Sequence, residues 1–303
     1  MIIGHKKQIR ILNNILASKN IPQTYFFSGP KGVGKLFVAK LFANSLINEY
    51  EEIIDYNDKN NSLLNLSVLN LESNKNIIEK NKATVGVGDV RKECNKLSLF
   101  PTRGKFRVLI IDDAEKLNIS SQNTLLKTLE EPNETSIIIL VASEEEGILK
   151  TILSRCQRIQ FDLVSFEEMR YAFANSLSSE ELDKAIVYSM GRPKNILKIL
   201  EKKSDTEKRD FEIKELKKII VSNNFEKFEL AEKYSKNFSE TSDLLEFWIW
   251  FLRIQAYRQM NDDNKKWERY YYLIEKIDQT LQKIKTTQNL NKKLILENLF
   301  LNL

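Results

Sequence analysis

Residues 28–36 read SGPKGVGKL, which has the spacing of a loop that binds nucleotide phosphates. Gly29 is followed, after four residues, by Gly34 and Lys35. Glycines let backbone N–H groups approach an anion, and a lysine at this position reaches the β- and γ-phosphates. We therefore expect Gly29, Gly32, Gly34 and Lys35 to bind the phosphates of ATP or ADP.

Leu36 departs from this pattern, because a serine or threonine is expected directly after the lysine. The missing hydroxyl normally holds the magnesium ion that bridges the phosphates and neutralises developing charge. A leucine side chain can do neither. The sequence thus predicts that nucleotide binding survives better than hydrolysis.

A second candidate site follows the apolar run RVLIID, residues 107–112. Asp112 at its end could orient magnesium, and Asp113 could activate a water molecule. ATPases of this type usually carry glutamate second, and the shorter Asp113 could misplace a general base by about an ångström, which can cost about a hundredfold in rate. The alternative is that Asp113 caps the helix that begins at AEKL.

The elements that must position these residues are continuous apolar strands separated by helical segments. Buried strands of this kind predict a parallel sheet covered by helices on both faces. A polar stretch rich in Asn and Lys, residues 50–82, interrupts the pattern, and we interpret it as an inserted loop. The expected strands are 24–29, 107–112 and 136–143, and the expected helices are 35–46 and 120–131.

The C-terminal third has a different composition. The last glycine is Gly191 and the last proline Pro193, so that residues 194–303 contain neither. Apolar residues recur there at three- and four-residue spacing, which predicts an all-helical structure. The apolar stretch FWIWFL, residues 247–252, fits either a buried core helix or a subunit interface.

Composition excludes several classes of protein. The chain has two cysteines, Cys94 and Cys156, and one histidine, so neither a disulfide framework nor a zinc site is expected. Its 47 lysines and arginines against 42 acidic residues do not indicate a concentrated basic patch, which leaves direct DNA contact open. No apolar run reaches the roughly 20 residues that span a bilayer, and the N-terminus lacks a secretion signal. We expect a cytoplasmic protein.

Three longer segments carry a resemblance to a known family: VGVGDVRKECNKLSLFPTRGKFRVLIIDDAEKLN (85–118), SSQNTLLKTLEEP (120–132) and TILSRCQRIQF (151–161). In this order and spacing they resemble the clamp-loader branch of the AAA+ ATPases, and within it most closely the delta-prime subfamily of bacterial DNA polymerase III. The resemblance is dense over residues 1 to about 200. It implies an α/β AAA+ phosphate-loop domain over 1–161, a helical lid over 162–205 and an all-α oligomerisation collar over 206–303.

The resemblance also implies roles for single residues. Arg155 matches an arginine finger that acts in trans on the ATP of a neighbouring subunit, although the residue alone reads as a surface arginine or an ion pair. Ser143 matches a polar sensor, with a turn cap as the alternative. Lys194 lies where motor subunits carry the arginine of a second sensor. Ile3, in IGH, matches the segment that lines the adenine pocket.

Leu36, Asp113 and Lys194 all deviate toward a subunit that binds ATP or ADP without efficient hydrolysis. The zinc module of many relatives is not expected, because residues 44–93 contain no cysteine. The implied partners are the gamma/tau motor subunits and the delta subunit, with the sliding clamp and primer-template DNA reached through the assembly. The alternatives are an ATP-hydrolysing, gamma/tau-like motor subunit and a non-replicative AAA+ ATPase.

Overall fold

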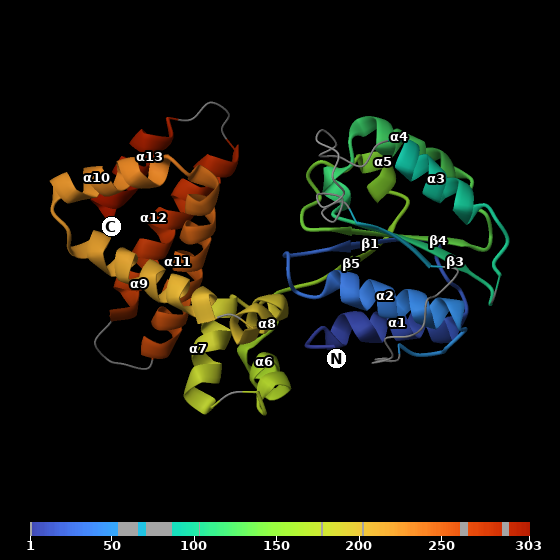
Figure 1. The fold of residues 1–303 in the computed structure, drawn as a ribbon, viewed down its shortest axis with the longest axis horizontal. Coiled ribbons are helices and arrows are strands. Elements are labelled where there is room, and N and C mark those ends of the chain that lie inside the picture. Colours follow the sequence, from blue (N-terminus) through green and yellow to red (C-terminus); the bar gives the residue numbers. More distant parts are fainter. Residues whose placement is uncertain are drawn as a thin grey trace. The chain divides into compact units, whose positions relative to one another are not determined.

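The chain forms two compact units, each with its own core. In the computed structural model, residues 2–53, 66–70, 87–102, 104–176, 178–201, 203–260, 266–286 and 291–303 are described (Figure 1). The first unit is Met1–Ala172 with Arg192–Lys194, and the second is Phe173–Gly191 with Asn195–Leu303. The finer division at residues 161/162 and 205/206 stays a prediction.

The first unit is built on a five-stranded sheet with the order β2-β3-β4-β1-β5, in which all neighbouring strands are parallel. The three strands expected from the sequence are confirmed, since β1, β3 and β4 begin and end within one residue of the predicted ranges. Strand bounds are Thr24–Ser28 (β1), Leu66–Asn70 (β2), Arg107–Asp112 (β3), Ser136–Ala142 (β4) and Gln157–Gln160 (β5).

Helices cover both faces of this sheet (Figure 1). Every residue of β1 and β4 is buried, and alternate side chains enter different cores. Tyr25 and Phe27 pack with helices α1 and α2, whereas Phe26 packs with α3 and α4. The predicted parallel sheet between helices is therefore confirmed. The helices of this unit are Lys6–Ser18 (α1), Lys35–Ile47 (α2), Val87–Leu97 (α3), the 3₁₀ helix Ala114–Lys116 (η2), Ile119–Glu130 (α4), Lys150–Leu153 (α5) and Phe166–Phe173 (α6).

The prediction of an inserted loop over residues 50–82 was wrong in its middle. Residues 66–70, LSVLN, form the edge strand β2, with Leu66 opposite Val108 and Leu69 opposite Ile111 of β3. The short strand was hidden by the Asn- and Lys-rich residues on either side, since composition over a long window hides a five-residue apolar run. The rest of the predicted insert, apart from residues 50–53, lies outside the described residues.

The second unit is all-helical, as the sequence predicted. Helix α11 packs along α12, and α10 along α13. The stretch 247–252 lies inside α11, where Phe247 and Trp248 are fully buried and the Trp248 indole donates to the Glu212 carbonyl at 2.9 Å. Core burial therefore accounts for this stretch. The helices are Ser179–Ser189 (α7), Pro193–Glu201 (α8), Lys203–Val221 (α9), Asn224–Ser235 (α10), Phe238–Gln259 (α11), Lys266–Thr286 (α12) and Lys292–Asn302 (α13).

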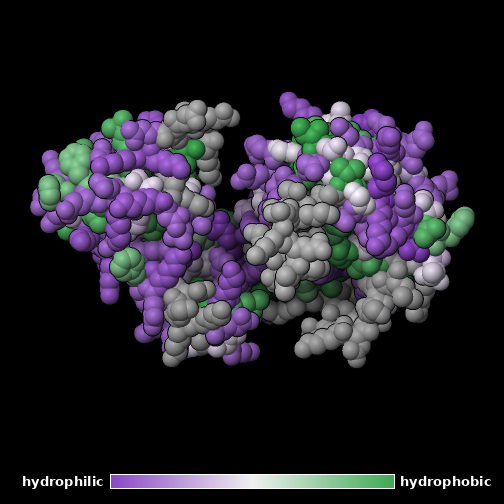
Figure 2. Space-filling model, turned by 45° about the horizontal axis from the view of Figure 1, so that its top comes forward, coloured by the Kyte–Doolittle hydropathy of each residue, from purple (hydrophilic) through white to green (hydrophobic). Residues whose placement is uncertain are grey.

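The face of the molecule drawn in Figure 2 is mostly polar. On the face drawn in Figure 2, hydrophilic side chains predominate and hydrophobic ones gather only in separate small groups. Within the described ranges, no helix combines the length and the apolar character needed to cross a bilayer.

Candidate nucleotide site

The loop between β1 and α2 has a backbone that requires glycine. Gly29, Gly32 and Gly34 have φ angles of 135°, 87° and 109°, a region that L-residues rarely adopt. At Gly29 the space is also closed, because a Cβ there would lie 2.0 Å from the carbonyl oxygen of Phe161. The glycines predicted to bind phosphate thus shape a loop that leads directly into the N-terminus of α2, where backbone N–H groups favour an anion.

Lys35 begins α2, and its amine folds back over this loop. Its Nζ donates to the carbonyl oxygens of Gly29 at 2.5 Å and Pro30 at 2.9 Å. Burial lowers the pKa of Lys35 to about 8, although Glu115 and, less strongly, the acidic pair after β3 act to raise it. The amine therefore remains mostly protonated at neutral pH, as binding a phosphate requires.

Leu36 contributes to packing. Its partly buried side chain packs against the core that α1 and α2 form with the sheet. The position that would carry a magnesium-binding hydroxyl is therefore used for apolar packing at the margin of this core. Within the described parts of the chain, no three His, Cys, Asp or Glu side chains converge in a metal-binding arrangement.

The two aspartates after β3 lie in different environments. Burial, together with the neighbouring Asp113, raises the pKa of Asp112. Asp113 is buried, has a left-handed backbone (φ 53°) and pairs with Lys116 through Oδ2 at 3.2 Å. It occupies the N-cap position of η2, but its side chain makes no capping hydrogen bond. This ion pair orients the Asp113 carboxylate toward Lys116.

Glu115 is a site residue that the sequence reasoning missed. Its Oε1 accepts a hydrogen bond from the backbone N–H of Ser143, the predicted sensor residue, at 3.3 Å. Its Oε2 is buried and has no hydrogen-bond partner among the described residues. Among the neighbouring charged groups, Glu115 has the largest effect on the pKa of Lys35, which it raises. The sequence shows only that an acidic residue follows two positions after Asp113. The packing of η2 against β4 places this residue beside Ser143.

The N-terminal segment contacts the same loop through His5. His5 is buried, and its Nε2 donates to the carbonyl oxygen of Val33 at 2.9 Å. Its ring packs edge-to-face on Phe161, with centroids 5.0 Å apart, and burial lowers the pKa of His5. Ile3 lies two residues before it and is half-buried; its contact with adenine stays a prediction. In the sequence, His5 belongs to the segment IGH that matches the lining of the adenine pocket, but it was considered by itself only as a histidine too isolated for a metal site.

The segment that carries Lys194 also touches the loop. The backbone N–H of Lys194 donates to the Gly32 carbonyl at 3.2 Å. A Cβ on Gly32 would lie 3.6 Å from the Cβ of Lys194 and 3.5 Å from that of Arg192. Arg192 was not predicted as a site residue, because the sequence pattern pointed only to the position two residues later. Both side chains begin at the phosphate loop, so either could contribute positive charge to it.

Arg155 lies in a different environment from these residues. Its guanidinium donates to the Thr151 carbonyl at 2.8 Å and to Glu130 at 3.2 Å. The side chains of Arg155 and Glu130 are 38% and 53% exposed. Both contacts lie at the ends of α4 and α5, and neither partner belongs to the phosphate loop. The interpretation of Arg155 as a surface ion pair thus describes its contacts in this chain, whereas its role in trans stays a prediction.

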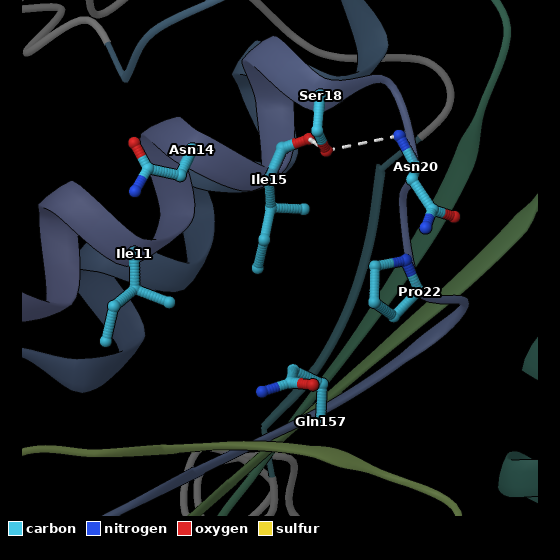
Figure 3. Close-up of a pocket in the computed structure, with 7 residues that line it drawn as sticks. All are labelled: Ile11, Asn14, Ile15, Ser18, Asn20, Pro22 and Gln157. Atoms are coloured by element: carbon cyan, nitrogen blue, oxygen red, sulfur yellow. Dashed lines mark hydrogen bonds between the residues drawn. The ribbon is translucent and has the colours of Figure 1, made fainter.

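A separate shallow pocket lies beside α1 (Figure 3). Its volume is about 280 Å³, and none of the phosphate-loop residues lines it. An apolar floor is bordered by amide side chains, and the Asn20 N–H donates to Ser18 Oγ at 3.3 Å at one end. It is therefore distinct from the nucleotide site. The lining residues are Ile11, Asn14, Ile15, Ser18, Asn20, Pro22 and Gln157.

Comparison with known proteins identifies related chains. The chain is 32% identical to DNA polymerase III subunit tau of Bacillus subtilis over 182 residues, which are 60% of this chain and 32% of the relative. It is 29% identical to DNA polymerase III subunit gamma of Buchnera aphidicola over 212 residues, 66% of this chain and 57% of that protein. The chain thus spans between about a third and three fifths of these relatives.

A solved structure of a DNA polymerase III gamma subunit-related protein from Thermotoga maritima aligns over 97% of both chains, with 17% identity and a TM-score of 0.43. A family model described as "DNA polymerase III, delta subunit" matches residues 4–165, which is more than half of the chain. This segment contains the phosphate loop, both aspartates, Glu115 and Arg155. The chain belongs to this DNA polymerase III family, and with it to the AAA+ clamp-loader proteins.

Proposed function

We propose that this chain is a clamp-loader subunit of the delta-prime type, which supplies Arg155 in trans to the ATP site of a neighbouring motor subunit. Through the assembly it helps to place the sliding clamp on primed DNA in the cytoplasm. Its partners are the gamma/tau motor subunits and the delta subunit. Membership of the DNA polymerase III family supports a place for this chain in a clamp-loader assembly. In this proposal the second unit serves as the collar through which the subunits assemble.

The observation that carries the proposal is the exposed guanidinium of Arg155. Exposed ion pairs such as the one with Glu130 contribute about 0–1 kcal/mol, so the arginine can exchange this partner at little cost. A planar guanidinium can bind phosphate oxygens bidentately, which suits it to stabilise charge in phosphoryl transfer. An arginine retained on the surface with so small a structural role is available to a neighbouring subunit.

The chain's own site, in this proposal, holds ATP or ADP without efficient hydrolysis. The glycine loop and Lys35 fit the phosphates. Leu36 supplies packing instead of a magnesium ligand, and Asp113 pairs with Lys116. Lys194 keeps a positive charge at the loop but lacks the fork of an arginine. These three residues, Leu36, Asp113 and Lys194, would impair ATP hydrolysis more than nucleotide binding.

The test is the ATPase rate of a loader reconstituted with this chain, gamma/tau and delta, stimulated by the sliding clamp and primed DNA. Arg155→Ala is compared with Arg158→Ala. Arg158 is a matched control, because it is 52% exposed and pairs with Glu145 at 3.3 Å. An arginine finger is worth roughly 10³–10⁵-fold at the site that it serves. We expect Arg155→Ala to abolish clamp loading and reduce stimulated turnover, and Arg158→Ala to change neither.

Equal rates for the wild-type and Arg155→Ala loaders would refute the trans role. Arg155→Lys adds a second comparison, since lysine keeps the charge but not the bidentate geometry. If Arg155 acts as an arginine finger, Arg155→Lys should lose activity as Arg155→Ala does. If only its positive charge matters, Arg155→Lys should keep the wild-type activity.

A second candidate is an ATP-hydrolysing motor subunit of the gamma/tau type. The similarity to tau and gamma subunits, together with Lys35 and Asp112, favours it. Vigorous ATP turnover by the isolated chain, lost in Lys35→Ala, would support it over the delta-prime proposal. A non-replicative AAA+ ATPase is the third candidate, and failure to assemble with gamma/tau and delta would favour that.

A further inference from the structure

Glu115 places a carboxylate in the candidate nucleotide site that the predicted roles do not use. Oε1 is held by the Ser143 N–H, and Oε2 is buried with no hydrogen-bond partner among the described groups. An unpaired buried carboxylate oxygen is costly, so its retention at this position requires an explanation.

The carboxylate lies at the edge of the sheet where a terminal phosphate is expected. Strand β4 lies between β1 and β3, and all three are parallel, so their C-terminal ends share one edge. The phosphate loop follows β1, Asp112 ends β3 and Ser143 follows β4. In sites of this kind the loop lysine reaches the β- and γ-phosphates, and the γ-phosphate lies toward the acidic strand end. Glu115 is bonded to the residue at the end of β4, on that same side.

Negative charge gathers at the strand ends of this edge. Asp112 and Glu115 contribute carboxylates, whereas the charge of Asp113 is compensated by Lys116. Lys35 is the positive group whose amine lies over the loop; Lys31 belongs to the same loop, and the side chains of Arg192 and Lys194 begin beside it. Position 36 offers no ligand for a magnesium ion that would neutralise added phosphate charge. A γ-phosphate would bring further negative charge close to the Glu115 carboxylate, and like charges in a partly buried site repel.

We propose that this site, taken as the nucleotide site of the proposed function, selects a nucleoside diphosphate over the triphosphate, and that the Glu115 carboxylate sets this preference by repelling the γ-phosphate. The β-phosphate keeps the loop N–H groups and Lys35 as its partners. The subunit would then hold ADP as a fixed structural ligand through the ATP cycles of its neighbours.

The test measures ADP and ATP binding to the full chain by isothermal titration calorimetry, with magnesium and with EDTA. The variants are Glu115→Gln, which keeps an oxygen acceptor for the Ser143 N–H but removes the charge, and Glu146→Gln. Glu146 is a matched control, because it is exposed in the loop after Ser143. We expect the wild-type chain to bind ADP at least about tenfold more tightly than ATP, as repulsion near one charge would give. Glu115→Gln should reduce this ratio below about threefold by tightening ATP binding, and Glu146→Gln should leave it unchanged.

Equal wild-type affinities for ADP and ATP would overturn the proposal. So would Glu115→Gln weakening ATP binding only when magnesium is present, because Glu115 would then be a metal ligand. Should Glu115→Gln fail to fold, as judged by thermal unfolding, the wild-type ratio still decides the preference. If neither nucleotide binds, both this preference and the nucleotide-holding part of the proposed function fail. The Arg155 test in the loader is independent of that outcome.

Discussion

The phosphate loop and the α5 turn that carries Arg155 belong to the same compact unit, but they are stabilised in opposite ways. In the loop, Lys35 bonds to two loop carbonyls and His5 bonds to a third. At the turn, Arg155 makes one bond to the carbonyl oxygen of Thr151 in α5 and one exposed ion pair with Glu130. The loop is fixed by the chain itself, whereas the Arg155 guanidinium is held weakly.

This difference separates the effects of mutation in the two regions. Changes in the loop should alter the stability of the chain as well as nucleotide binding, because the same atoms serve both. Changes at the Arg155 turn should leave stability almost unaffected and act only in the assembled loader.

Gly29→Ala should give the largest loss. The new Cβ would lie 2.0 Å from the Phe161 carbonyl oxygen, at a φ of 135°. We expect the free energy of unfolding to fall by more than about 3 kcal/mol, or the first unit not to fold. At Gly34 the described atoms leave a Cβ free space within 4 Å, so Gly34→Ala should cost only the backbone strain of about 1–3 kcal/mol.

Urea unfolding followed by far-UV circular dichroism measures both glycine variants. The three tryptophans of the chain lie in the second unit, so their fluorescence reports whether that unit is unaffected. Equal losses in the two variants would mean that the contact with Phe161 does not determine the loop.

Leu36→Thr should exchange packing for a hydroxyl. Because Leu36 is only partly buried, we expect a loss of about 1–2 kcal/mol, below the range for fully buried leucines. ATP turnover by the isolated chain should stay absent, since Asp113 and Lys194 also deviate, and should become measurable only when Asp113→Glu and Lys194→Arg are added. ATP turnover by Leu36→Thr alone would show that the leucine at position 36 is sufficient to explain the absence of ATP hydrolysis.

Acidification should lower the stability of the folded chain through protonation of His5. Burial holds the pKa of His5 below its unfolded value of about 6.5, although Asp162 and Glu168 act to raise it and Lys35 acts to lower it. The unfolded chain therefore binds more protons in this window, and stability should decrease as the pH falls through and below about 6.5. His5→Gln, which can still donate to the Val33 carbonyl, should flatten this dependence in thermal unfolding at several pH values. An unchanged profile in His5→Gln would assign the dependence to other groups.

Glu130→Gln should have the smallest effect. It removes the ion pair with Arg155, which is exposed on both sides, so the free energy of unfolding should change by less than about 1 kcal/mol. A larger loss in urea unfolding would mean that Arg155 is a structural residue, which would weaken the argument for its role in trans.

Much of the fold could be predicted from the sequence. Buried parallel strands are continuous apolar runs, and β1, β3 and β4 were located within one residue. Strand β2 was not found, because it is a five-residue edge strand within a polar stretch. The absence of Gly and Pro after Pro193 correctly predicted helices, but not that α11 would bury FWIWFL in the core of its own unit.

The candidate site was predicted in part. The glycines, Lys35 and the two aspartates form local patterns whose spacing reflects a strand, a turn and a helix, so they can be read in order along the chain. Glu115, His5 and Arg192 could not be found in this way. Each reaches the site through a contact between segments that are distant in the sequence: Glu115 with Ser143, His5 with Val33 and Arg192 with Gly32.

The phosphate loop, its lysine and the missing hydroxyl at position 36 follow from the order of residues alone, because local spacing sets both the backbone conformation and the chemical groups that are present. Which polar groups have hydrogen-bond partners, and which stay exposed to a neighbouring subunit or a ligand, depends on the packing of distant segments. Burial and hydrogen bonding depend on neighbours that packing supplies. Packing leaves one carboxylate oxygen of Glu115, Oε2, buried without a hydrogen-bond partner among the described residues, and it leaves the Arg155 guanidinium exposed after α5.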